Sequence, residues 1–248
     1  MNKNNIKCFI LSLICVVLVA CGSGIKKYPF KAVAENIVDY LESVINKPEL
    51  ANDEDFNEDF RDKQETLLKK MQGTSIGTTI DDGIGYEVID NKGNIICAQE
   101  GGWARDKVEV FINFELKIKD AKTAFENNDL MVVFYDDQDN AAYVESLGAA
   151  IEENAKVDVD TIAMVDTMAV ADSGIDAEQF SLPFKDGDIV TKGVRVYFKV
   201  FSAKTFVNIT KAVIKKYEYS LYREINNSYE EKIEEERYRI KNAIGGSD

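Results

Sequence analysis

The segment 108–118 alternates apolar and polar side chains along its whole length, and it constrains the fold more than any other part of the chain. One face carries Val108, Val110, Ile112, Phe114, Leu116 and Ile118. Polar residues occupy the opposite face, apart from Phe111. A period of two predicts a β-strand. One apolar and one polar face are typical of an antiparallel sheet with a single solvated face.

Other segments predict further strands of the same sheet. Residues 194–200 alternate in the same way, while 130–135 are apolar throughout and are predicted to be buried on both faces. Segments 86–89 and 95–98 flank the turn Asp90-Asn91-Lys92-Gly93-Asn94, which predicts a β-hairpin. The segments 117–123 and 199–205 share a register, either because of an internal duplication or because they are similar strands of one sheet.

Helical periodicity appears at both ends of the chain. Apolar residues recur at helical spacing in 31–46, in 53–73 and, on a narrow stripe, in 208–244. The segment 136–156 has two interpretations, a turn leading to a strand through 142–147 or a capped helix. A further helix is predicted over 160–171.

Together these patterns predict an α+β fold, mainly antiparallel β and sandwich-like, with two N-terminal helices and a long C-terminal helix. The predicted organisation is a signal peptide (1–20), a tether (21–30), a helical N-terminal segment (31–73), a β-rich domain (74–207) and a C-terminal helix (208–244).

The first residues have the composition of an export signal. Lys3 and Lys7 precede an apolar run over 8–19. That length suits a signal peptide, whereas a membrane-spanning helix needs about 20 apolar residues. The run ends in Leu18-Val19-Ala20-Cys21, which resembles the lipobox of bacterial lipoproteins. The resemblance implies cleavage before Cys21 and attachment of diacylglycerol to its thiol.

Lipid on Cys21 would anchor the chain to a membrane without spanning it, because two acyl chains suffice for stable attachment. The expected location is extracytoplasmic. Gly22 is not the acidic residue that retains lipoproteins at the inner membrane of diderm bacteria, so the outer membrane is expected there. In a monoderm cell the expected site is the outer face of the cytoplasmic membrane.

Charge argues against a nucleic-acid partner. The formal net charge of −14 becomes −16 once Lys3 and Lys7 leave with the signal peptide. Such a balance repels phosphate backbones and offers no basic patch for anionic lipid. The membrane contact is therefore predicted to be the lipid on Cys21, and the other expected partner is a protein of the cell envelope.

Cysteine and histidine usage restricts the chemistry. After processing, Cys97 is the one thiol left free, so no intrachain disulfide is expected, and its apolar surroundings predict a core position. The chain contains no histidine, which removes the usual zinc, Ser-His-Asp and Cys-His systems. No catalytic residue and no cofactor is predicted.

Asp136, Asp137 and Asp139 are the weak candidates for a metal site. Closely spaced carboxylates suit Ca²⁺, but the run lacks the glycine and the distant glutamate of a calcium loop, and it fits a turn better. The sequence therefore favours a non-enzymatic binding or scaffolding role for a lipid-anchored envelope lipoprotein. The alternatives are a carboxylate-based, glycosidase-like hydrolase and a solute-binding lipoprotein.

Overall fold

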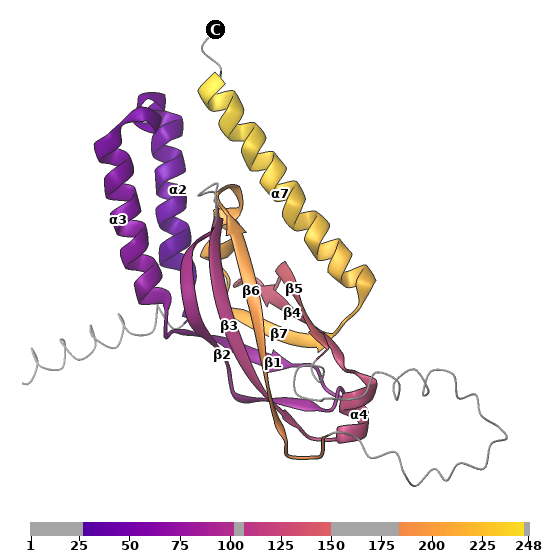
Figure 1. Ribbon diagram of the computed structural model, residues 1–248. Helices are drawn as coiled ribbons and strands as arrows, with labels where there is room; N and C mark the ends of the chain where they lie inside the picture. The colour runs from indigo at the N-terminus through magenta and orange to yellow at the C-terminus, as the bar shows by residue number, and fades with distance from the viewer. Residues whose placement is uncertain (1–26, 102–106, 150–183, 246–248) are drawn as a thin grey trace, which may run out of the picture.

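The computed structural model describes residues 27–101, 107–149 and 184–245. The predicted helix over 160–171 and the predicted signal peptide lie outside these residues. The described elements form an α+β fold, in which a curved sheet carries helices at one end and along one side (Figure 1). In chain order the elements are α2 (Lys31–Asn46), η1 (Pro48–Asn52), α3 (Glu54–Met71), β1 (Ser75–Ile80), β2 (Tyr86–Gly101), β3 (Lys107–Ile118), α4 (Ala121–Glu126), β4 (Asp129–Tyr135), β5 (Ala141–Ala149), β6 (Ile189–Lys199), η3 (Val200–Ser202), α6 (Ala203–Val207), β7 (Lys211–Lys216) and α7 (Tyr219–Gly245).

The seven strands form one sheet in the order β5-β4-β7-β1-β2-β3-β6. Every neighbouring pair is antiparallel except β1 and β7, which are parallel. The sheet curls until its two edge strands are joined by a hydrogen bond from a backbone N–H of β6 to a side-chain hydroxyl of β5, so the barrel is nearly closed. The mainly antiparallel sheet is confirmed. The sandwich-like arrangement is not, because the strands make one curved sheet instead of two stacked ones.

Aromatic rings fill one end of the barrel. Phe30, Phe134, Phe198 and Phe206 are fully buried, and the Phe198 and Phe206 rings stack with centroids 4.4 Å apart. Phe30 directly precedes α2, and its ring lies 5.6 Å from that of Phe198. Burial of such a ring contributes about 1.5–3 kcal/mol. The start of α2 is therefore fixed to the barrel core.

Strand β4 is buried on both faces, as its continuous apolar sequence predicts. Leu130 and Val132 point into the main core. Met131 and Val133 point outward, where they pack against Ile225 of α7. The first part of α7 thus covers the outer face of β4 and β5.

The structure corrects the prediction for 208–244 and decides between the two interpretations of 136–156. The predicted helix over 208–244 begins only at Tyr219, and β7 lies within that range as a central strand. Its buried residues Ala212 and Ile214 alternate as in a strand. Ile214 also fits helical spacing with Tyr217 and Leu221, which is why the strand was missed. In 136–156 the turn interpretation is correct as far as Ala149, and the helical one is wrong there.

The similar segments 117–123 and 199–205 lie on neighbouring strands. In each, a strand of the β3–β6 pair ends and a short helix begins, α4 in the first case and α6 in the second. This shared local structure accounts for the common register, and an internal duplication stays a prediction. None of the helices in the described ranges has the length and apolarity needed to cross a bilayer.

Candidate functional site

The three aspartates predicted as weak metal ligands form the turn between β4 and β5. The Asp136 carboxylate accepts the backbone N–H groups of Gln138 and Asn140 at 2.9 and 2.8 Å. Partial burial opposes ionisation of Asp136, but the hydrogen bonds from Asn140 outweigh it, so the pKa of Asp136 is lowered. Asp139 pairs with Lys211 at 2.7 Å.

These contacts are those of a turn. Asp137 is exposed beside them, and no group of three potential metal ligands exists within the described part of the chain. The turn interpretation of 136–140 therefore accounts for the aspartates without a metal ion. Cys21, the predicted lipidation site, lies outside the described residues.

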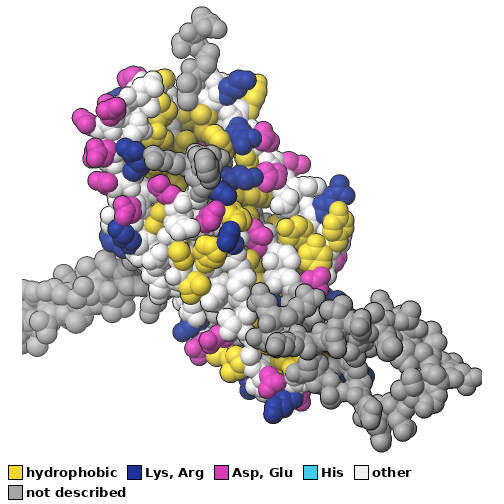
Figure 2. All heavy atoms as spheres, viewed as in Figure 1, with side chains coloured by type: hydrophobic (Ala, Val, Ile, Leu, Met, Phe, Trp, Pro, Cys, Tyr) yellow, Lys and Arg dark blue, Asp and Glu magenta, His cyan; other side chains and the backbone are white. Residues whose placement is uncertain are grey.

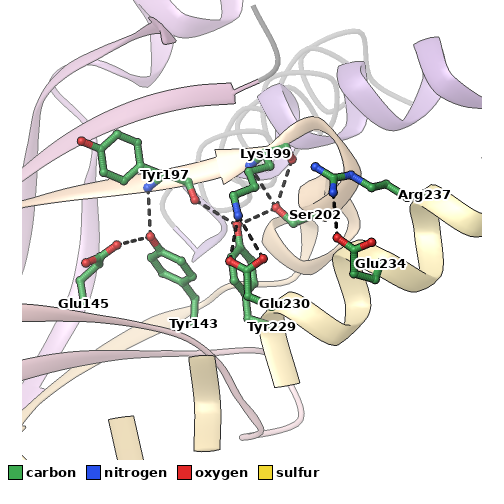
Figure 3. Close-up of polar contacts among 9 residues, drawn as sticks. All are labelled: Tyr143, Glu145, Tyr197, Lys199, Ser202, Tyr229, Glu230, Glu234 and Arg237. Atoms are coloured by element: carbon green, nitrogen blue, oxygen red, sulfur yellow. Dashed lines mark hydrogen bonds and ion pairs between the residues drawn. The ribbon is translucent and has the colours of Figure 1, made fainter. Parts of the chain in front are cut away.

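A cluster of polar side chains joins the two edges of the sheet where β5 approaches β6, a place called the seam here (Figure 3). Its centre is the backbone of Tyr197 on β6. The Tyr143 hydroxyl on β5 accepts the Tyr197 N–H at 3.2 Å. The Tyr229 hydroxyl on α7 donates to the Tyr197 carbonyl oxygen at 3.1 Å. Both backbone groups of this edge residue are thus satisfied by tyrosine hydroxyls in place of a neighbouring strand.

Glu145 lies beside this junction. It pairs with Val132 across β4 and β5, and its side chain therefore shares the inner face of the sheet with Val132 and Tyr143. Its carboxylate accepts a hydrogen bond from the Tyr143 hydroxyl (Figure 3). Burial raises the pKa of Glu145, and burial together with the Glu145 charge raises the pKa of Tyr143.

The α7 side of the seam is tied down as well. Burial raises the pKa of Tyr229 to about 12, and its hydroxyl lies 2.8 Å from that of Ser202. Lys199 Nζ donates hydrogen bonds to the two carboxylate oxygens of Glu230, at 2.8 and 3.1 Å (Figure 3). The seam therefore holds one carboxyl group with a raised pKa and a second carboxylate paired with a lysine. Its polar groups connect elements of the fold to one another.

A charged network fixes the far half of α7 to the helices at the barrel end. Arg239 contacts Glu42 of α2 at 2.8 Å and Glu236 at 2.6 Å, and Lys204 of α6 contacts the same two glutamates. The hydrogen bond from Arg239 is the main reason that the pKa of Glu236 is lowered. This network sets the position of α7 relative to α2.

A second candidate region is a groove of about 470 Å³ between α3 and the C-terminal end of β2. Its size falls within the range of small-ligand sites. Its lining residues come from these two elements: Arg61, Asp62, Glu65, Leu68, Lys69, Gln72, Ala98, Gln99 and Glu100. Glu65 pairs with Lys69, and the hydrogen bond from that lysine lowers the pKa of Glu65. A general acid needs the opposite shift.

The prediction that Cys97 lies in the core is wrong. The structure places it next to Gln72, which lines this groove. The thiol is half-buried, and Gln72 Nε2 lies 3.9 Å from its sulfur. The pairing of β2 with β3 shifts register between Ile95 and Cys97. Ile95, before the shift, is buried inside the barrel, whereas Cys97, after it, is only half-buried. Sequence reasoning missed both the groove and the seam, since each is built from segments far apart in the chain.

The raised carboxyl pKa and the open cavity therefore occur in different places. The seam has the shifted pKa of Glu145 but is closed by hydroxyl contacts, and the groove is open but its carboxylate Glu65 is stabilised as an anion. Over the visible surface, acidic and basic side chains are interspersed, with several acidic ones on the α3 side (Figure 2). Comparisons with protein-family models, curated proteins and solved structures find no match to this chain.

Proposed function

We propose that this protein is a lipid-anchored lipoprotein of the cell envelope with a non-enzymatic binding or scaffolding role. The observation that carries the proposal joins sequence and structure. Cys21, in its lipobox-like context, stands nine positions before Phe30, whose ring is fully buried in the barrel. Nine extended residues span at most about 30 Å. A lipid on Cys21 would therefore hold the folded body next to the membrane.

A binding role accounts for the distribution of ionisable groups better than catalysis does. A carboxylate hydrolase of the glycosidase type needs two acids at a cleft, one of them with a raised pKa. In the described residues that combination is divided between the seam and the groove. Turnover of a glycoside, ester or peptide panel by the purified protein, lost on mutating the groove carboxylates, would overturn the non-enzymatic role.

Substitution of Cys21 tests the anchor, and Cys97 provides a matched control. Wild-type protein made in a bacterial host should incorporate labelled fatty acid and enter the detergent phase on phase separation. Cys21→Ala should lose the label and appear either as soluble protein or as an uncut precursor. Cys97→Ala should behave like wild type. A processed Cys21→Ala protein that stays in the membrane would refute lipid anchoring at this residue.

Membrane fractionation tests the proposed location. In a diderm host the wild-type protein should separate with the outer membrane, whereas Gly22→Asp should shift it to the inner membrane because an acidic residue then follows the lipidated cysteine. In a monoderm host, externally added protease should digest the protein on intact cells. Protection from protease in the monoderm host would contradict extracytoplasmic exposure.

A further inference from the structure

The groove between α3 and β2 lies along a part of the sheet edge that has no neighbouring strand among the described residues. Strand β1 pairs with β2 only as far as Asn94, through Ser75. One residue further, Ile95 exchanges backbone hydrogen bonds with Thr74 and Gly73, at 3.0 and 2.8 Å. Beyond Ile95, β2 continues to Gly101 with β3 on one side and, among the described residues, no backbone bond on the other. Helix α3 faces this side of β2 across the groove.

The backbone groups of alternate residues on this edge point toward α3. In an antiparallel pair, each residue directs its N–H and C=O either to its partner strand or away from it. Gln72 Nε2 donates to the Ala98 carbonyl oxygen at 3.2 Å, so the backbone N–H and C=O of Ala98 point away from β3. By the same alternation Glu100, two residues on, also presents its N–H and C=O on the groove side. The bond from Gln72 shows that this edge accepts a hydrogen bond from a group lying in the groove.

The groove has an apolar floor and a polar wall that side chains of an added strand could contact. Leu68 and Ala98 are buried and form the apolar floor. The polar wall comes from one face of α3, where Arg61, Glu65 and Lys69 are exposed. An edge strand bordered by a helix is a recurrent geometry for recognising extended peptides, with backbone bonds supplying affinity and flanking pockets supplying selectivity.

The charges of the groove indicate which peptide fits. Glu65 is engaged by Lys69. Asp62 and Glu100, both exposed, make no ion pair with any described residue, and neither does Arg61, so the unpaired charges of the groove still leave an excess of one negative charge. Glu100 belongs to the open edge itself, so a basic side chain on an added strand would lie near it. The whole chain carries a net charge of −14, which favours approach of a cationic segment over an anionic one.

We propose that this groove binds an extended, lysine- or arginine-containing peptide segment of a partner protein, which adds to β2 as a further strand along Ala98–Glu100. The inference deepens the proposed binding role by naming the chemistry of the partner. It does not depend on the anchor, since anchoring is read by lipid labelling and peptide binding by a separate signal.

The test uses the full-length processed protein in detergent micelles and a fluorescent synthetic octapeptide of alternating valine and lysine. Three matched peptides accompany it: alternating valine and glutamate, valine and serine, and the lysine peptide with every second amide N-methylated. The lysine peptide should bind with micromolar to millimolar affinity. The N-methylated form, which keeps the side chains but loses half of the N–H donors, should bind at least tenfold more weakly.

Hydrogen exchange read by mass spectrometry locates the peptide. Bound lysine peptide should slow exchange in peptic fragments that cover residues 97–101 and leave those covering β5 and β6 unchanged. The double variant Asp62→Asn, Glu100→Gln should weaken binding about three- to tenfold. The matched control Asp82→Asn, Asp137→Asn removes two exposed carboxylates elsewhere and should bind like wild type.

Several results would overturn the proposal. They are equal binding of the N-methylated peptide, equal binding of the glutamate peptide, or protection confined to other parts of the barrel. Absence of binding up to millimolar peptide would also refute it. Protection of 97–101 that rises with protein concentration alone would assign the edge to a second copy of the chain in place of a partner peptide.

Discussion

The barrel handles two open strand edges in different ways. At the seam, the N–H and C=O of Tyr197 are bonded by the hydroxyls of Tyr143 and Tyr229, side chains that are only 4 % and 3 % exposed. At the groove, the outward-pointing groups of Ala98 and Glu100 meet one side-chain donor among the described residues, the exposed C-cap residue Gln72 of α3. An unpaired edge is a template for another strand unless something covers it.

The contrast separates a structural junction from an interaction surface. Hydroxyls buried at the seam replace a strand at the cost of placing polar groups in a dry site, where each must be bonded. The groove pays no such penalty, since water or a peptide can bond its backbone. Two sheet edges with the same unpaired backbone thus differ in whether side chains of the same chain already occupy them.

Loss of both seam hydroxyls should have the largest effect. The double variant Tyr143→Phe, Tyr229→Phe leaves the buried backbone groups of Tyr197 without partners, so we expect a loss of about 2–5 kcal/mol in the free energy of unfolding, measured with urea. The double variant Tyr219→Phe, Tyr238→Phe removes two hydroxyls at 65 % and 70 % exposed positions and should cost less than about 0.5 kcal/mol. Equal losses would mean that the seam hydroxyls do not hold the barrel closed.

Amide exchange should distinguish the two edges without any substitution. The Tyr197 N–H is bonded at the seam and should exchange at least about a hundredfold more slowly, relative to its intrinsic rate, than the Glu100 N–H at the groove. The measurement is exchange of the peptide-free protein with single-residue resolution. Slow exchange at Glu100 in dilute, peptide-free protein would show that this edge is already covered.

The seam should also respond to pH through Glu145. Burial raises the pKa of Glu145, so the folded state favours the protonated form of this carboxyl group. The contribution of protonated Glu145 to the free energy of unfolding is fully present below the unfolded pKa, about 4.3. This contribution is lost as pH rises through the folded pKa. Glu145→Gln stays neutral and still accepts from Tyr143. We therefore expect this variant to exceed wild-type stability at pH 7–8 by about 1 kcal/mol or less, with the difference closing below about pH 4.

Glu236→Gln is the matched control with the opposite sign. The hydrogen bond from Arg239 lowers the pKa of Glu236, so its contribution is present above the unfolded pKa and is lost as pH falls through the folded one. This variant should be less stable than wild type at pH 7 and equal to it in acid. Melting temperatures from pH 3.5 to pH 8 give both curves, and two curves of the same sign would contradict the assignment of Glu145.

The smallest effect is expected at the groove. Gln72→Ala removes the bond to the Ala98 carbonyl, which water can replace, so stability should fall by less than about 0.5 kcal/mol. Gln64→Ala on the same helix removes the buried acceptor of Asn36 Nδ2, 2.8 Å away, and should cost about 1–3 kcal/mol. A large loss from Gln72→Ala would show that Gln72 closes this edge structurally.

The sequence predicted those elements whose pattern has one explanation. The alternation in 108–118 indicated β3, and the continuous apolar run at 130–135 indicated a strand buried on both faces, since β4 does have α7 on one side and the barrel core on the other. Strand β7 was missed because it is only six residues long and its Ile214 continues the helical spacing of the segment that follows. Its parallel partner β1 is distant in sequence, so no turn between the two strands indicates their pairing.

The candidate regions were harder to predict because their chemistry depends on alignment between distant segments. Nothing near Tyr143 in the sequence shows that its hydroxyl meets Tyr197 or that Glu145 faces inward, since the register of β5 against β4 decides both. The groove depends on where β1 stops pairing with β2, and no composition signal marks that point. Cys97 was predicted to be in the core because the irregularity in β2 is invisible in the sequence.

The place of β7 in the sheet has a consequence for the order of folding. β7 is the last of the described strands, yet it lies between β4 and β1 and connects the β5–β4 pair to the other four of them. A chain emerging N-terminus first therefore holds two separate pieces of sheet until residue 216 is available. The contacts that join them pair residues far apart in the sequence, such as Gly77 with Lys211, and such long-range contacts slow folding. The barrel is consequently completed only after β7 has emerged and entered the middle of the sheet, and α7 follows it onto β4 and β5.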